Sequence, residues 1–413
     1  MNRDLTIVLL TSCVRSIAIS ALSVFYGLYL AALGLSEVEI GFLIASGLLG
    51  MAVGTLIAAR FADSVGRRKS LVILTLVMAG SGLLLALASD KYVLVGASFV
   101  GMINGMGRDR GPLQALDQAI VAQCSPGEAR TPMFARYTFL MDLGGAVGAL
   151  FAGIPQSLNE YRIGLTLYAM ALVALVPIYS ALGSGIESAK NPLSTATFSP
   201  ETRRRIVRFA SLSTLDSLGG GFITRSLLTY WFVQRFTVEQ FWIGPLFAAA
   251  AIMNSFAYFV AAWLAKRFGL VNTMVFTHIP SSIFLMLVPL APSFPVAVGL
   301  FLAREFFAPM DVPTRQSYLA AVVQEHERSA AAGIVNMTRN ASWVVGPTLA
   351  GWAMTFSFSA PLYFAGILKI VYDLSLWRAF RKILPPEEIV QRHMKHAADI
   401  VNHIDNKPRK RRV

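Results

Sequence analysis

Charged residues are scarce in this chain of 413 residues, where Asp, Glu, Lys and Arg make up 14% and hydrophobic residues 55%. Length alone would suggest two or three soluble domains, but the distribution of the apolar residues excludes them. Residues 5–33, 38–59 and 71–89 form long, nearly uncharged runs. At about 1.5 Å of rise per residue, each run can cross a hydrocarbon core of about 30 Å as a helix. The membrane is therefore the solvent of this protein.

Cysteine is nearly absent, since Cys13 and Cys124 are the only two. Both lie beside apolar residues and give neither a disulfide framework nor the spacing of metal ligands, which favours small buried side chains. The chain also has no Walker loop, no HExxH sequence and no Ser-His or Cys-His pairing. These absences argue against an ATP-driven pump and against a membrane-embedded enzyme, and we expect no cofactor.

Similar apolar runs begin near residues 92, 132, 163, 209, 241, 271, 296, 330 and 360, which makes twelve with the first three. The sequence therefore predicts an all-α membrane protein with twelve transmembrane helices. The first run begins at Leu5 behind Arg3 and lacks a small-residue cleavage site, which favours a retained helix over a removable signal peptide.

The formal net charge of +13 is concentrated in alternate loops. The cations on this side include Arg67, Arg68, Lys69, Arg130, Lys190, Arg203, Arg204, Arg205, Lys266, Arg267, Arg328 and Arg381. Because positively charged loops stay in the cytoplasm, we expect a multi-pass protein of the cytoplasmic (inner) membrane with both termini inside. The same placement argues against nucleic acid as a partner and in favour of the lipid bilayer, on which the tail after Pro386 should lie as a basic amphipathic helix.

Comparison of the chain with itself shows an internal repeat. A shift of 203 residues places Gly41 on Gly244, and a shift of 198 places Arg130 on Arg328. Six spans separate the copies, so both have the same orientation: two six-helix bundles related by a pseudo-twofold axis along the membrane normal, as in alternating-access carriers. The predicted division is 1–183 for the N-terminal bundle, 184–208 for a cytoplasmic linker, 209–384 for the C-terminal bundle and 385–413 for the tail.

The charged stretch ARFADSVGRRKS at 59–70 resembles the loop between helices 2 and 3 of the major facilitator superfamily. SPGEART at 125–131 and QEHERSA at 324–330 resemble two further loops of that superfamily, so the resemblance covers essentially the whole chain. It implies a secondary active transporter, with helices 1, 4, 7 and 10 around a central cavity. We expect a monomer that carries a small-molecule substrate. The chain departs from the pattern at Ala149, which replaces the usual Pro of a helix-5 motif found in many proton-coupled exporters.

By the same resemblance, the gate lies in the cytoplasmic loops. Its candidate residues are Asp63, Gly66, Arg67, Arg68, Arg130 and Arg328. Gly66 would permit a sharp turn at positive φ, and Asp63 would dock at the start of helix 11 in the opposite bundle, where a helix N-terminus attracts a carboxylate. We hypothesise that Asp63, Arg67 and Arg130 close the cytoplasmic side in the outward-open state. The alternative is that the cations only face lipid phosphates and fix the topology.

Ionisable residues inside the spans are costly and usually functional. Arg keeps its proton at working pH, so guanidinium groups are candidate anion clamps and carboxylates are candidate proton carriers. The candidate substrate-binding residues are Arg15, Arg108, Arg110, Arg225, Tyr230, Arg304, Arg315 and Asn340. The candidate proton-coupling residues are Asp109, Asp117, Asp142, Glu305 and Asp311. Structural pairing is the alternative for each of them, and Asp216, Arg339, Lys369 and Asp373 are further charges in the spans.

The sequence thus predicts a proton-coupled carrier of a small polar or anionic solute, with alternatives left open. If Tyr230 and Trp231 form an aromatic wall of the cavity, they would suit a multidrug or amphiphile exporter. The alternative is that they belong to the aromatic belt at the membrane interface. Met274 and His278, at i and i+4, would suit a soft-metal-ion transporter, whereas a polar contact is the simpler role for His278. A receptor built on the carrier fold is a further class. Substrate and direction of transport stay open.

Overall fold

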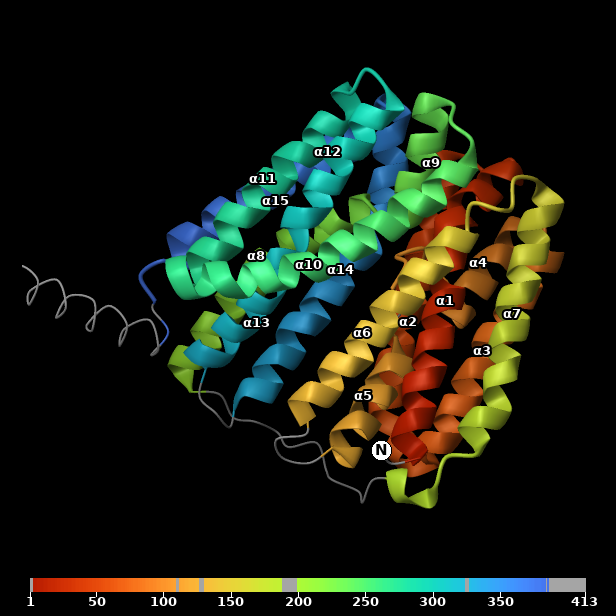
Figure 1. Ribbon diagram of the computed structural model, residues 1–413, viewed down its shortest axis with the longest axis horizontal. Coiled ribbons are helices and arrows are strands. Elements are labelled where there is room, and N and C mark those ends of the chain that lie inside the picture. The colour runs from red at the N-terminus through yellow and green to blue at the C-terminus, as the bar shows by residue number, and fades with distance from the viewer. Residues whose placement is uncertain are drawn as a thin grey trace, which may run out of the picture.

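The computed structural model describes residues 3–108, 111–125, 130–187, 199–323, 327–383 and 385, which are helical and contain no strand. The first bundle consists of α1 (Arg3–Ala32), α2 (Glu37–Val65), α3 (Arg67–Leu87), α4 (Lys91–Gly101), α5 (Pro112–Cys124), α6 (Arg130–Phe151) and α7 (Leu158–Ser180). The second consists of α8 (Pro200–Phe222), α9 (Arg225–Phe236), α10 (Ile243–Phe268), α11 (Leu270–Leu287), α12 (Phe294–Phe307), α13 (Asp311–Val322), α14 (Arg328–Phe356) and α15 (Ala360–Phe380). The predicted all-α fold with twelve crossings in two bundles is confirmed, because α4–α5, α8–α9 and α12–α13 each form one interrupted crossing (Figure 1).

Six helical segments of the described residues are long and apolar enough to cross a membrane. They are α1, α2, α3, α7, α11 with the 3-10 helix η4 (Val288–Leu290), and α10 with the 3-10 helix η3 (Gln240–Trp242). The other crossings are interrupted or carry more charge. Their polar groups must find partners inside the protein, because the bilayer core offers none.

Glycine builds the interruption between α4 and α5. Gly105 and Gly107 have φ values of 66° and 81°, where any other side chain would be strained, and Pro112 then starts α5 at its first turn. In the 198-residue repeat, residues 110–112 correspond to the 3-10 helix η5 (Ala308–Met310), which interrupts the crossing formed by α12 and α13. Both copies of the repeat therefore break the same crossing.

A second feature repeats with the other shift. Gly66 joins α2 to α3 at φ 100°, and Gly269 joins α10 to α11 at φ 87°. Each glycine N–H donates to the carbonyl four residues earlier, of Ala62 at 2.9 Å and of Ala265 at 3.0 Å. The positive φ expected of Gly66 is confirmed, and the 203-residue repeat is present in three dimensions.

The two bundles meet backbone to backbone where α2 crosses α14. A Cβ atom on Gly41 would lie 2.2 Å from the carbonyl oxygen of Pro347, and one on Gly351 would lie 2.2 Å from that of Glu37. Real Cβ atoms do not approach this closely. Both positions therefore require glycine for the helices to touch.

The repeat creates the same interface a second time, between α10 and α6. Gly244 is the copy of Gly41, and its Cβ position lies 2.8 Å from the carbonyl oxygen of Ala149, the copy of Pro347. Gly153 likewise faces the Gln240 carbonyl, at 3.2 Å, as Gly351 faces Glu37. The bundles are thus joined by two equivalent seams, as a pseudo-twofold axis between them requires.

These contacts lie toward one end of the molecule. We call the end that holds the segment between α7 and α8 the linker side and the opposite end the far side; α1 runs from the linker side to the far side. The bundles share hydrogen bonds in their middle and far-side parts, for example from Ser226 Oγ to the Ser23 carbonyl at 2.6 Å and from Tyr161 Oη to Gln240 Oε1 at 2.5 Å. Toward the linker side the bundles diverge (Figure 1).

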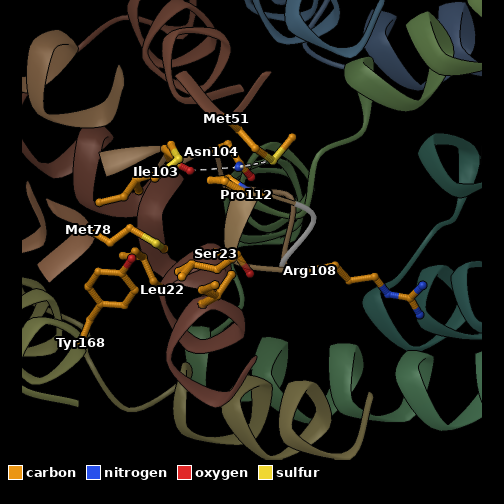
Figure 2. Close-up of a pocket in the computed structure, with 14 residues that line it drawn as sticks. Leu22, Ser23, Met51, Met78, Ile103, Asn104, Arg108, Pro112 and Tyr168 are labelled. Carbon is orange, nitrogen blue, oxygen red and sulfur yellow. Dashed lines mark hydrogen bonds between the residues drawn. The ribbon is translucent and has the colours of Figure 1, made fainter. Parts of the chain in front are cut away.

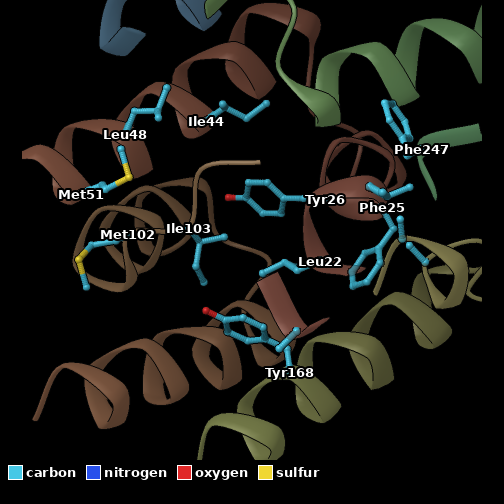
Figure 3. Packing of buried hydrophobic residues seen from close by; sticks show 14 of the residues in the cluster. Leu22, Phe25, Tyr26, Ile44, Leu48, Met51, Met102, Ile103, Tyr168 and Phe247 are labelled. Carbon is cyan, nitrogen blue, oxygen red and sulfur yellow. The ribbon is translucent and has the colours of Figure 1, made fainter. Parts of the chain in front are cut away.

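An apolar core continues through the contact region of the bundles. Figure 3 shows Leu22 of α1 beside Tyr168 of α7, and Phe25 of α1 on the side of Phe247 of the second bundle. Tyr26 is fully buried in this core, and its hydroxyl shares a hydrogen bond of 2.6 Å with Ser98. The core holds the far-side halves together and leaves the polar residues of the interrupted crossings at the centre of the molecule.

Candidate functional site

A polar cavity of about 230 Å³ lies against the interrupted crossings of both bundles. A second cavity of about 120 Å³ shares Arg108, Arg225, Ala251 and Asn254 with it. The cationic residues that line the two are Arg108, Arg225, Arg304, Arg315, Arg339 and Lys369, and the acidic ones are Asp142, Asp216, Glu305 and Asp311. Among the described residues, six cations therefore face four carboxylates.

Arg225 reaches this cavity because α9 begins there. Thr224 caps the helix, and Arg225 is its first residue. The guanidinium lies 5.2 Å from the centre of the Phe247 ring, and Nη1 donates to Ser20 Oγ at 2.6 Å. A Cβ on Gly107 would lie 2.5 Å from the Arg225 Cζ, so this glycine makes room for the guanidinium. No carboxylate of the described residues forms an ion pair with Arg225.

Arg108 enters from the first bundle, just after the positive-φ glycines. Its guanidinium lies 3.4 Å from Asp142, in a pair that is partly exposed. Figure 2 shows the Arg108 side chain pointing away from the small apolar pocket around Met51 and Met78 and toward the second bundle. Arg108 and Arg225 therefore approach one cavity from opposite bundles.

The part of the cavity wall that α10 and α12 form is also polar. Arg304 bonds its neighbour Glu305, and Asn254 Nδ2 donates to Glu305 Oε2 at 3.2 Å. The Asn254 Oδ1 and the Arg304 Nε are buried without a hydrogen-bond partner among the described residues. A buried polar atom without a partner is costly, so this part of the cavity wall has unused hydrogen-bonding capacity.

A cluster of charged side chains fills the interior of the second bundle beside the cavity. We call it the Asp216 cluster, and it consists of Asp216 (α8), His278 (α11), Asp311 and Arg315 (α13), Arg339 (α14), and Lys369 and Asp373 (α15). Asp216 lies 2.6 Å from Lys369, 2.9 Å from Arg339 and 3.5 Å from Arg315. A carboxylate with three cations at these distances is ionised and fixed in place.

The Asp216 cluster shows what the sequence-based site list missed. Asp216, Arg339, Lys369 and Asp373 stand out in the sequence as charges in the spans, but no spacing in the chain shows that three different helices bring them to one point. His278 was considered with Met274, and its partner is instead Asp373, at 3.0 Å. No group of three His, Cys, Asp or Glu side chains suited to a metal occurs among the described residues.

A separate ion pair lies inside the first bundle. Arg15 and Asp117 bond each other at 0% exposure. Arg15 also donates to the Tyr179 hydroxyl, and Tyr137 donates to Asp117 at 3.4 Å. Neither Arg15 nor Asp117 lines the cavity, and the two form an ion pair within the first bundle.

Other candidates lie away from the cavity. Tyr230 is buried, and its hydroxyl donates to Glu37 on the far side at 3.2 Å. Trp231 donates through Nε1 to Ser359 Oγ at 3.2 Å. Asn340 lies on α14 without lining either cavity. Asp109 and Arg110 lie outside the described residues.

Two candidate gate residues, Arg67 and Arg68, form hydrogen bonds within the first bundle. Arg67 Nη1 donates to Gln123 Oε1 at 2.7 Å, and Arg68 Nη1 donates to the Leu182 carbonyl at 3.3 Å. The carboxylate of Glu187 accepts from the Arg67 backbone N–H at 2.6 Å. The latch to the opposite bundle stays a prediction, because the side chains of Asp63, Arg130 and Arg328 lie outside the described part.

Comparisons with known proteins agree with this architecture. Residues 8–182 and 210–410 match the sequence model of the Major Facilitator Superfamily. The uncharacterized membrane protein YJR124C of Saccharomyces cerevisiae is 25% identical over 418 residues, which cover 91% of this chain and 93% of the yeast protein.

Solved transporter structures share the fold. The nucleoside transporter NupG superposes with a TM-score of 0.73 at 14% identity, over 92% of this chain and 99% of NupG. A D-xylose-proton symporter gives 0.70 at 16% identity, over 93% of this chain and 98% of its own. A POT family transporter in complex with 5-aminolevulinic acid gives 0.75 at 13% identity, over 93% and 97%.

Proposed function

The chain belongs to the Major Facilitator Superfamily, and from that premise we propose that it is a secondary active transporter that couples protons to the movement of a small polar or anionic solute. The solute binds between the bundles, where Arg108 and Arg225 approach one cavity from opposite sides. The carrier works as a monomer by alternating access in the cytoplasmic membrane, with the linker side and both termini in the cytoplasm. The positive charge of the linker-side loops supports this orientation.

One observation carries the choice of an anion: Arg225 has a hydroxyl and an aromatic ring as neighbours and no carboxylate partner among the described residues. An Arg in a cavity with excess positive charge attracts a carboxylate or phosphate, which its guanidinium can bind through two parallel hydrogen bonds. Phe247 beneath the guanidinium holds it in place through a cation–π contact.

The proposal is tested first by binding. Purified protein is screened by thermal shift against inorganic phosphate, succinate, citrate and glucuronate, with xylose and uridine as uncharged comparisons. We expect an anion to stabilise the protein. Arg225→Gln should then weaken that anion by about 10-fold or more, since a hydrogen bond to a charged group contributes about 1.5–3 kcal/mol.

The control is Arg235→Gln, which removes the same charge from the exposed end of the same helix. It should leave anion binding unchanged. Flux of the stabilising anion into proteoliposomes at two pH values then tests coupling. Stabilisation by the uncharged compounds alone, or equal affinity in both variants, would contradict the proposed anion site.

A further inference from the structure

His278 is placed between two carboxylates in the Asp216 cluster. It is 3% exposed, and its Nδ1 lies 3.0 Å from both oxygens of Asp373. Its Nε2 lies 3.7 Å from Asp216 Oδ1. Because Nδ1 faces a carboxylate, the neutral ring carries its hydrogen on Nδ1 and donates it to Asp373. The nitrogen that remains open to a further proton is Nε2.

The helices packed around His278 supply charges of both signs. The titratable or charged residues that face it are Asp216 from α8, Asp311 and Arg315 from α13, and Lys369, Tyr372 and Asp373 from α15. Arg339 of α14 contacts Asp216, which in turn faces His278.

The charged residues of the other neighbouring elements pair with one another or lie elsewhere. On α12, Arg304 and Glu305 bond each other, and η5 has no titratable residue. On α10, Tyr258 lies beside Arg108, and Lys266 and Arg267 lie in the last turn, on the linker side.

The fixed charges of the cluster cancel. Arg315, Arg339 and Lys369 are three cations, and Asp216, Asp311 and Asp373 are three carboxylates. With neutral His278 the cluster carries no net charge, and with the imidazolium it carries one positive charge. A net charge buried in a bilayer-spanning bundle is unfavourable unless a counter-ion lies nearby.

The counter-ion can come from the cavity. His278, Arg315, Arg339 and Lys369 all line it. An anion beside these cations would balance the imidazolium, so anion binding and proton binding favour each other to the same extent.

We propose that His278, held by Asp373, is the site at which the carrier binds its coupling proton. The proton passes from cavity water to His278 Nε2 when an anion enters, and it returns to water after the anion has left. No other bond forms or breaks. This inference rests on the proposed anion transport and names the residue that couples it, which is not one of the carboxylates predicted from the sequence.

Direct titration of His278 tests the site without any substrate. The full chain, labelled with 15N-histidine and reconstituted in lipid nanodiscs, is followed by NMR over about pH 5 to 8, the range in which histidine changes charge. His278→Gln identifies the signal among those of the other four histidines. We expect a reversible change from the neutral ring, protonated on Nδ1, to the imidazolium.

Two variants test whether the neighbours act as proposed. Asp373→Asn removes the carboxylate that favours the imidazolium and should lower the midpoint by about 1–3 pH units. Lys369→Met removes a cation and should raise it, while Asp216 keeps Arg339 and Arg315 as partners. A His278 signal that keeps one protonation state throughout, or that titrates identically in all three proteins, would overturn the proposal.

Coupling is tested with the same anions. The anion is the one among phosphate, succinate, citrate and glucuronate that stabilises the protein. In weakly buffered solution its binding should cause proton uptake by wild type, which a pH-sensitive dye reports. The His278→Gln variant should take up no proton. Binding without proton uptake in wild type would overturn the coupling role while leaving the anion site intact. If Arg225→Gln binds the anion as tightly as wild type, the proposed anion site is contradicted. That result leaves the titration of His278 as a separate finding.

Discussion

At the scale of single residues, the protein places buried charge in two different settings. Arg15 and Asp117 are fully buried and bond each other, with two tyrosines in support. Arg225 instead lies at a cavity beside a hydroxyl and a ring. A buried ion is costly without a partner. Arg15 has the opposite charge of Asp117 beside it, whereas we propose that a bound anion supplies the opposite charge for Arg225.

This difference predicts the effect of removing Arg15. Arg15→Met leaves the Asp117 carboxylate buried without its cation, and breaking a buried pair in this way costs about 3–5 kcal/mol of unfolding free energy. The double variant Arg15→Met/Asp117→Asn removes both charges and should recover most of the loss. Thermal unfolding of the two variants in detergent measures this.

Transport by the same double variant decides the role of Arg15. We expect it to carry the anion as wild type does, because the pair does not line the cavity. Lys91→Met, which opens an exposed pair of 3.5 Å with Glu39, is the stability control and should unfold at the wild-type temperature. A stable double variant that no longer transports would restore Arg15 as a substrate-binding residue.

At the scale of helices, the seams between the bundles depend on glycine rather than on large side chains. In each seam a glycine of one bundle faces a backbone carbonyl of the other. The backbones therefore approach closely at the seams, beside the apolar core that the two bundles share. In the proposed alternating access, these are the contacts that would separate when the bundles part on the far side.

The prediction at this scale concerns Gly41→Ala. Its methyl group would lie 2.2 Å from the Pro347 carbonyl oxygen, so α2 and α14 must move apart. We expect the far side to open, seen as a longer distance between spin labels at Gln156 and Ser293 in double electron–electron resonance.

Gly80→Ala is the matched control, because nothing lies within 4 Å of its Cβ position. It should leave the spin-label distance unchanged and stabilise α3 by up to about 1 kcal/mol, the usual helix preference of Ala over Gly. Equal distances in Gly41→Ala and wild type would show that the seam does not hold the far side closed.

At the scale of the whole molecule, the bundles are joined on the far side and diverge on the linker side (Figure 1). On the linker side, Arg205 bonds within its own bundle, to the Val322 carbonyl at 3.0 Å. We therefore expect the cavity to be reached from the linker side.

Chemical labelling of a cavity residue tests that access. Ala251→Cys, at a position shared by both cavities, is made in a chain without Cys13 and Cys124. A membrane-impermeant maleimide should react with it faster from the linker side than from the far side of oriented proteoliposomes. Ser293→Cys, exposed on the far side, should show the opposite order. Faster labelling of Ala251→Cys from the far side would contradict the direction of opening.

The sequence by itself determined the crossings, the two bundles and their repeat. Length and hydropathy decide which segments enter a bilayer, and a shift of 203 residues predicts that Gly66 and Gly269 make the same turn, as they do. It also named Arg108, Arg225, Arg304, Glu305, Asp311 and Arg315, which line the cavity, because ionisable residues inside a span are conspicuous.

Only the tertiary structure decided which charges meet. Arg15 and Arg225 are alike in sequence, yet one is paired inside a bundle and the other faces a cavity. Asp216, His278, Arg339 and Lys369 come from four helices and meet because those helices pack around one point. A helix pattern fixes the depth of a side chain in the membrane, whereas the rotation and neighbours of the helix fix its partner.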